Sequence, residues 1–183
     1  MSSRPRPVTA TTPLDADDAR FVAAARLRAS RLQPYLAAAV YALVPVSQPG
    51  LGTFAVDGHW RLYLDMEQSR EWGVEASAAV LLHEAHHVLR DHNGRARRAG
   101  VNGAHQNYLW NLAGDAAIND DLRADGAPLP DGGVYPRHLG APDNLLEEAY
   151  YRLLLDGDSD ALDPDPKCGS GAGGETLDCE PPD

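Results

Sequence analysis

The chain of 183 residues is long enough to bury one sizeable core and too short to favour two domains. With 43% hydrophobic and 23% charged residues, it has the composition of an ordinary globular protein. Its formal net charge of −11 argues against non-specific nucleic-acid binding, which depends on Lys and Arg neutralising phosphates. No apolar run reaches the ~18 residues of a membrane helix, and residues 1–13 lack the apolar stretch of a secretory signal. We therefore expect a cytoplasmic protein that binds neither nucleic acid nor membrane.

Composition divides the chain into three segments. We expect a flexible arm at 1–14, a folded domain at 15–155 and an acidic tail rich in Gly and Asp at 156–183. Both cysteines, Cys168 and Cys179, lie in this tail. One pair of cysteines makes no disulfide framework, so we interpret them as a local loop closure or as free thiols.

The first half of the folded domain is expected to form two helices and a β-hairpin. Asp15 is a typical N-cap for a helix to about residue 31, and Pro34 suits the first turn of a second helix that ends near residue 43. The Pro- and Gly-containing stretch 44–52 should end this second helix. Strand-like runs at 53–56 and 60–64 flank Asp57-Gly58, a strong turn signal, and the second run alternates as if one of its faces were buried.

Three further helices are expected in the second half. The first, at 74–91, is apolar on most sides and should be buried, and Asn93-Gly94 should end it. A basic connection at 95–107 leads to a helix at 109–122. An ordered loop or lid at 125–142 follows, and Asp143 should cap the last helix. This order of elements predicts a small, mainly helical α+β domain.

The strongest chemical signal is a His-Glu-x-x-His sequence on the buried helix. His83 and His87 fall within about 40° of each other on one helix face, so their imidazoles can share one cation. Imidazole nitrogen suits Zn²⁺. Glu84 lies beside that face, where it can take a proton from a metal-bound water. Two histidines and a glutamate on an apolar helix are costly unless they are paired or bind a metal, which argues against a purely structural role.

A zinc site of this kind needs a third protein ligand, and two residues are candidates. His92 could coordinate only if the helix ended early and the chain doubled back, because a continuing helix turns it about 180° from His83. Asp115 is the better candidate, since Asn111, Asp115 and Asn119 form a polar stripe on an otherwise apolar helix. Gly114 would let two helices approach closely, and Asn119 would orient one of the histidines. The alternative for Asp115 is a structural hydrogen bond.

The chain also resembles a known family. The run at 53–58, the His-Glu-x-x-His helix and Trp110-Asn-Leu-Ala-Gly-Asp-Ala-Ala-Ile-Asn119 are similar to the bacterial predicted metallopeptidase domain associated with von Willebrand factor A domains and MoxR-type ATPases. The resemblance implies a zincin-like fold, with a small curved sheet over the active-site helix and a second helix that brings the third ligand. It also implies a possible ATPase or von Willebrand factor A partner. No von Willebrand module follows residue 183, so we expect a stand-alone member or a piece of a longer chain.

These observations favour a zinc metallopeptidase that cleaves a peptide or protein substrate, with metal ligands His83, His87 and Asp115 and Glu84 as general base. The alternative is a catalytically silent metal-binding module of a larger assembly, and a zinc hydrolase of non-peptide amides stays open. No residue is assigned to the oxyanion; the candidates are His86, His105, Tyr108, Tyr135 and His138. We expect His59 and the Trp60 strand to flank the cleft edge, where an extended substrate could add as a further strand.

Overall fold

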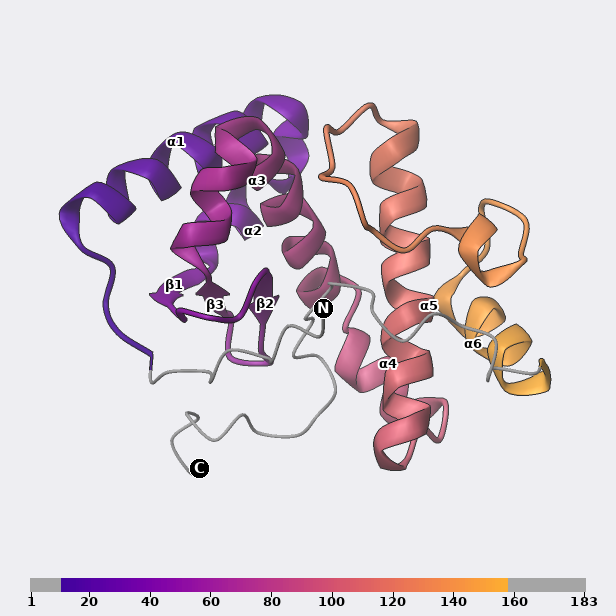
Figure 1. The fold of residues 1–183 in the computed structure, drawn as a ribbon. Coiled ribbons are helices and arrows are strands. Elements are labelled where there is room, and N and C mark those ends of the chain that lie inside the picture. The colour runs from indigo at the N-terminus through magenta and orange to yellow at the C-terminus, as the bar shows by residue number, and fades with distance from the viewer. Residues whose placement is uncertain (1–10, 158–183) are drawn as a thin grey trace, which may run out of the picture.

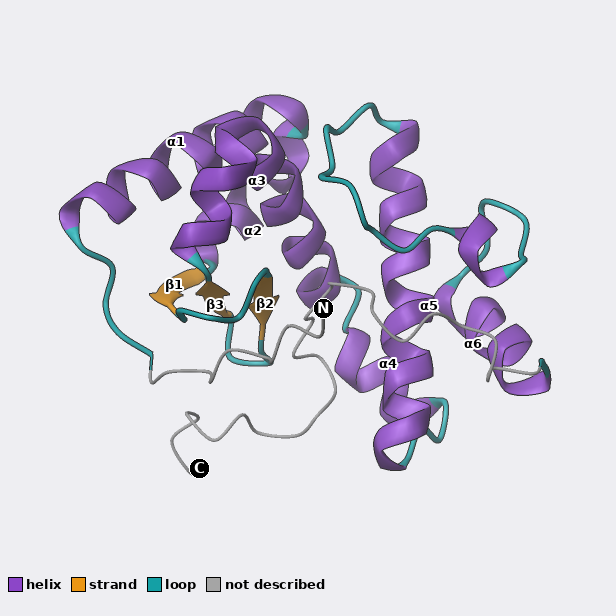
Figure 2. Cartoon of the chain, viewed as in Figure 1, coloured by secondary structure: helices purple, strands orange, loops and turns teal. Residues whose placement is uncertain are grey.

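The structure is a computed structural model that describes residues 11–157. Most of the predicted arm and tail, including Cys168 and Cys179, lies outside these residues. The expected α+β class is confirmed, because helices dominate and the three strands form one small sheet (Figure 2). Within residues 11–157, no helix is both long and apolar enough to cross a membrane. The helices are α1 Ala16–Leu32, α2 Ala37–Ala42, α3 Met66–Leu89, α4 His92–Arg98, α5 Gly103–Ala124 and α6 Glu147–Asp156, with 3-10 turns Pro34–Leu36 and Pro136–Leu139.

The sheet has the strand order β1-β3-β2, with β1 Val44–Ser47, β2 Phe54–Val56 and β3 Arg61–Leu64. β2 and β3 form the expected antiparallel hairpin. β1 was not expected, because Pro45 and the nearby glycines suggested a break. It pairs in parallel with β3, which supplies hydrogen bonds that no local signal reveals, and an edge strand tolerates Pro45. Thr12, from the predicted flexible arm, pairs with Ser47 on that same edge.

The position of β3 corrects two expectations. β3 is the central strand, so an extended substrate cannot add to it, and the edges are β1 and β2. Both of its faces are largely covered, because Tyr63 is nearly as buried as Leu62 and Leu64, which point to the opposite face. Trp60 precedes the strand with a positive φ of 63° and belongs to the hairpin turn. The buried Asp57 carboxylate holds that turn by accepting hydrogen bonds from two backbone N–H groups, an arginine and the hydroxyl of Tyr63.

α3 is longer than predicted and bends once. It starts at Met66 because the Asp65 side chain accepts hydrogen bonds from the backbone N–H groups of Glu67 and Gln68. Gly73 has φ 74° and ψ 176°, values outside the helical region, and marks the kink. The segment after the kink is the helix that the sequence predicted, and it carries the His-Glu-x-x-His residues.

Three other expectations about helices were wrong. Asn93-Gly94 does not end a helix, because α3 ends at Leu89 and the left-handed Asp91 caps the new helix α4. α4 occupies the start of the predicted basic connection, and α5 begins earlier than expected, at Gly103. Asp143 does not cap α6, whose N-cap residue is Leu146, and Asp143 instead pairs with Arg123.

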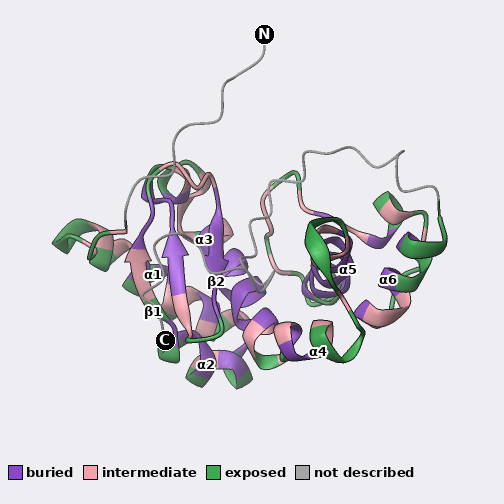
Figure 3. Cartoon of the chain, turned by 90° about the horizontal axis from the view of Figure 1, so that it is seen from below, coloured by how far each residue is buried: buried purple, intermediate pink, exposed green. Residues whose placement is uncertain are grey.

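Two apolar clusters flank the seam between α3 and α5. The first joins α1, α2, α3 and the sheet, and includes Leu62 and Leu82 as well as Ile118 and Leu122 from α5. The second joins α5, α6 and the loop between them around Trp110 and Tyr150. Figure 1 shows these two groups of elements on either side of the seam. Burial is concentrated on the sheet, α3 and α5 (Figure 3), and several buried polar side chains lie in the seam between the two helices.

Candidate metal site

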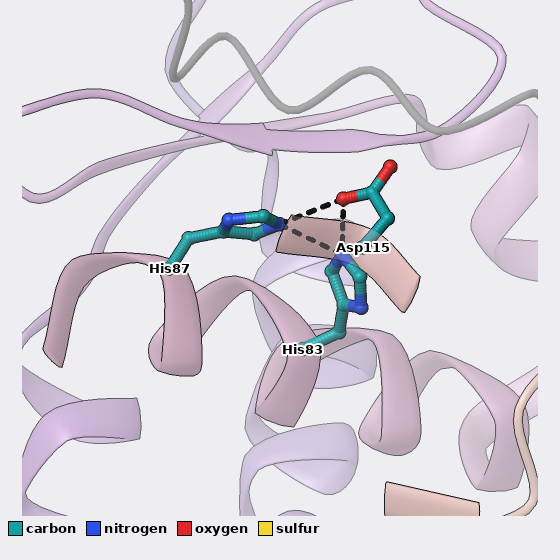
Figure 4. Close-up of side chains that lie close together, drawn as sticks. All are labelled: His83, His87 and Asp115. Carbon is teal, nitrogen blue, oxygen red and sulfur yellow. Dashed lines mark hydrogen bonds and ion pairs between the residues drawn. The ribbon is translucent and has the colours of Figure 1, made fainter. Parts of the chain in front are cut away.

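Three donor side chains converge in this seam. His83 and His87 project from α3 and Asp115 projects from α5, toward one another (Figure 4). The distance from Nε2 of His87 is 2.9 Å to Nε2 of His83 and 3.1 Å to Oδ1 of Asp115. The third separation, from His83 Nε2 to Asp115 Oδ1, is 3.4 Å. All three residues are almost fully buried. One atom from each residue can therefore reach a common point.

The local sequence explains how the two helices come this close. His83 and His87 are four residues apart and so lie on the same face of α3, as the spacing predicts. On α5, Asp115 is surrounded by Ala113, Gly114 and Ala116, which are fully buried or nearly so and add little bulk between the helix axes. Small side chains at this crossing let a short aspartate reach both imidazoles.

Asn119 lies one turn beyond Asp115 and fixes the orientation of His83. Its Oδ1 is 2.8 Å from Nδ1 of His83, and its Nδ2 donates to the backbone carbonyl of Val134 at 2.9 Å. The second bond determines which way the amide points, so Oδ1 can only accept a hydrogen bond from the imidazole. Nδ1 of His83 therefore carries hydrogen, and Nε2 presents its lone pair to the centre of the group.

Glu84 lies beside this group and has no visible partner. Its side chain is completely buried, and neither carboxyl oxygen forms a hydrogen bond within residues 11–157. Burial raises the pKa of Glu84 to about 8, against the opposing effect of His83. A buried carboxyl without a partner is costly, and such groups commonly mark sites where a water, ion or substrate completes the structure.

The pKa values of two of the three donors, His87 and Asp115, suit a cation. Burial lowers the pKa of His87 to about 3, so its imidazole is neutral and can donate a lone pair. Burial would raise the pKa of Asp115, but the two imidazoles beside its carboxylate outweigh that effect and hold the pKa well below its usual range. Burial lowers the pKa of His83, but Asp115, Glu84 and Asn119 together outweigh burial and raise it, so a cation would compete with a proton for this imidazole. An anionic oxygen and two imidazole nitrogens around one point form a donor set that Zn²⁺ accepts.

His92 is not part of this group, although the helix does end before it. Its ring packs edge-on against His87, with 4.8 Å between ring centroids. Its nitrogens face away from the three donors, with Nδ1 3.4 Å from Glu147 and Nε2 3.3 Å from Asn111. Gly114 makes room for this ring, because a Cβ there would lie 2.3 Å from Cε1 of His92. His92 thus supports the ring of His87 from behind.

The candidates for stabilising an oxyanion have other surroundings. Tyr135 lies between two guanidinium groups, with Cζ of Arg137 4.7 Å and Cζ of Arg123 5.2 Å from its ring centroid. His138 accepts a hydrogen bond from the backbone N–H of Tyr135 and so caps a 3-10 turn. His86 is 3.4 Å from the guanidinium of Arg90, and burial lowers its pKa to about 4. These three of the five candidates therefore have partners outside the donor group.

Two hollows border the donor group at opposite ends of β2. The first, of about 130 Å³, is lined by His83 and Asn119 and by Thr53, just before the strand. The second, of about 180 Å³, is lined by His87 and His92 and by Val56, at the end of the strand.

Sequence reasoning missed the residues that support the site from a distance. Glu147, which faces His92, is one of two glutamates in the first turn of α6 and resembles an ordinary helix-dipole charge. The carbonyl of Val134, which holds Asn119, belongs to a loop with no motif. Neither residue carries a local signal, because both contacts join segments far apart in the chain.

Comparison with known protein families gives a match to the family described as "Putative metallopeptidase domain", over residues 18–182. No curated protein and no solved structure matches the chain. The matched range includes both helices of the seam and the loop that follows α5.

Proposed function

The chain belongs to this metallopeptidase-domain family, and from its site we propose that it is a zinc-dependent metallopeptidase that hydrolyses peptide bonds. His83, His87 and Asp115 would hold the metal, and Glu84 would be the general base. The observation that carries the proposal is the pairing of three convergent buried donors with a buried carboxyl that has no partner within residues 11–157. Bound Zn²⁺ would polarise the scissile carbonyl and make a water acidic near neutral pH.

Glu84 then moves one proton. As a carboxylate it accepts the proton of the attacking water, and as a carboxylic acid it donates that proton to the nitrogen of the leaving amine. Burial, which raises the pKa of Glu84 to about 8, makes a proton held there transferable near neutral pH. Positioned general bases of this kind contribute on the order of 10²–10⁴-fold to a rate.

The rest of the seam holds these groups in place. Asn119 fixes the His83 ring through Nδ1, and the His92 ring supports His87. The four groups are shielded from bulk solvent, since His83, Glu84, His87 and Asp115 are each at most 2% exposed. Charge interactions are stronger where water is excluded, which favours a site that handles developing charge.

The proposal is tested by Glu84→Gln, which keeps the size of the side chain and removes its basicity. We expect the variant to retain about one equivalent of zinc by elemental analysis and to lose at least about a hundredfold in peptide hydrolysis. Glu75→Gln, an exposed position on the same helix that pairs with Arg28, is the control and should match the wild type. Hydrolysis by Glu84→Gln at the wild-type rate would refute Glu84 as the base.

The competing function is a catalytically silent metal-binding module in an assembly with an ATPase or a von Willebrand factor A domain. A zinc-loaded wild-type protein that cleaves no member of a broad peptide library would favour that function. In that case, co-purification with such an ATPase would be the next measurement.

A further inference from the structure

The smaller hollow beside His83 is an open pocket whose surface is mainly apolar. It lies between the start of β2, the first turns of α3 and the loop after α5, and it adjoins the His83 side of the metal group. Four of its lining residues are apolar, namely Trp72, Val80, Leu129 and Pro130, and they come from both sides of the opening. Val80 is buried and the other three are partly exposed, as expected for the walls of an open pocket.

The charges around the hollow restrict what can enter. Asp131 is exposed on the loop, and it is the one acidic residue among those that line this hollow. No Lys or Arg lines it, so an acidic side chain would lose its hydration without gaining a partner. Gln68, also in the lining, donates its amide to Glu71 on the helix surface. The interior therefore favours an apolar occupant.

The size of the hollow suits a large side chain. Its volume of about 130 Å³ is close to that of an engineered apolar cavity of about 150 Å³ that binds benzene. A leucine or phenylalanine side chain is of this order, and burying one in an apolar pocket is worth about 1.5–3 kcal/mol, or roughly 10- to 150-fold in affinity. An alanine or glycine would leave most of the space unfilled.

We propose that this hollow is the specificity pocket of the enzyme and takes a bulky apolar side chain next to the scissile bond. This inference rests on the proposed function, because the pocket can select substrates only if the neighbouring site at His83 and Asn119 cleaves peptides. The substrate class is a peptide with leucine, phenylalanine or a similar residue beside the bond that is cut. Residues of α3 and of the loop after α5 would both contact this side chain and so select it.

The first test needs neither metal nor catalysis. The full chain, treated with a chelator, is titrated with N-acetyl-leucinamide, N-acetyl-glycinamide, N-acetyl-lysinamide and the α-amide of N-acetyl-glutamic acid, which keeps its side-chain carboxyl. The readout is the indole N–H resonance of Trp72, one of three tryptophans, assigned by its loss in Trp72→Phe. We expect the leucine probe to bind on the order of tenfold or more tightly than the glycine probe. Equal binding, or tighter binding of the lysine or glutamate probe, would overturn the inference.

Two variants locate the binding. Val80→Phe fills the hollow from α3 and should remove the preference for leucine over glycine. Val88→Phe, two turns later on the same helix, points into the other hollow and is the matched control, which should keep the preference. If Val80→Phe fails to fold, Leu129→Ala widens the pocket from the loop and should shift the preference from the leucine probe toward N-acetyl-tryptophanamide. An unchanged preference in the folded variants would place the binding elsewhere.

Cleavage profiling of the zinc-loaded protein completes the test. The expected result is a preference for leucine or phenylalanine beside the cut, which Val80→Phe abolishes. Probe binding without any cleavage would refute the proposed function, while the pocket would stand as a binding site for an apolar side chain. Cleavage without a preference at this position would refute the pocket and leave the proposed function intact.

Discussion

The apolar core between α1–α3 and the sheet is as buried as the seam between α3 and α5, yet the two regions are completed in different ways. α3 contributes to both, with Leu81, Leu82 and Ala85 in the core, and His83 and His87 in the seam. The core is filled by side chains that need no partner beyond close packing. The seam contains groups that need hydrogen bonds, charge compensation or a cation.

The core and the seam therefore stabilise the fold in different ways, the core by packing and the seam by binding a ligand. The packing energy of the core is independent of solution conditions such as metal concentration. The seam is linked to its ligand, since any ion that binds only the folded state adds to the free energy of unfolding. Depth of burial alone therefore does not say whether a region stabilises the fold; the chemistry of the buried atoms decides.

The largest effect on stability is expected from truncation in the core. Leu62→Ala removes a completely buried side chain from the central strand and should cost about 3 kcal/mol, or roughly 10 °C in melting temperature. The loss should be equal in zinc and in chelator, measured by calorimetry under both conditions. A loss confined to the zinc-loaded protein would mean that the core and the seam are not separate.

Asp115→Ala, in contrast to Leu62→Ala, should change the stability of the zinc-loaded protein far more than that of the metal-free protein. Its loss of zinc affinity should exceed the 10- to 100-fold typical of an outer-shell contact, and zinc should no longer raise the melting temperature. Asp120→Ala is the control on the same helix: Asp120 is buried and accepts hydrogen bonds from Arg123 and from the backbone N–H of Asn144, so the variant should lose stability and keep zinc. Titration against a competing chelator measures both. Retention of zinc by Asp115→Ala would exclude it as a ligand.

A smaller effect is expected where His92 packs against Gly114. Gly114→Ala places a Cβ where Cε1 of His92 now lies and should destabilise the protein by about 1–3 kcal/mol. His92→Ala should also lose stability, because Glu147 loses a partner, while zinc stays near one equivalent. The double variant should be less destabilised than the sum of the two, since removing the imidazole makes room for the new methyl group. Additive losses would show that the two residues do not interact.

The smallest expected effect concerns pH and lies outside the seam. Burial opposes ionisation of Asp57, but hydrogen bonds from Arg61, Tyr63 and His59 hold its pKa below the usual range. A lowered pKa in the folded state contributes stability above the unfolded pKa, and this contribution is lost as pH falls through the folded value. Asp57→Asn should therefore cost on the order of 1–2 kcal/mol at pH 7 and progressively less below about pH 4. Urea unfolding at both pH values measures the difference, and a pH-independent cost would contradict it.

The sequence predicted the seam better than it predicted the fold around it. The spacing of His83 and His87, and the stripe of Asp115 and Asn119, repeat at helical periodicity, so each set is visible within one helix. β1 was missed because its pairing with β3 is a contact between segments far apart in the chain. α4 was missed because the turn before it depends on a left-handed conformation at Asp91, which residues other than glycine rarely adopt. The orientation of His92 depended on where α3 ends, which no local pattern revealed.

The Asn119 amide joins the metal group to the loop after α5, since it holds His83 on one side and the carbonyl of Val134 on the other. Two events that share one element are thermodynamically coupled, and the coupling works equally in both directions. A peptide that shifts this loop on binding should change zinc affinity, and zinc should change peptide affinity by the same factor. Hydrogen exchange of the loop amides should therefore slow when zinc binds, even though the loop supplies none of the three donors.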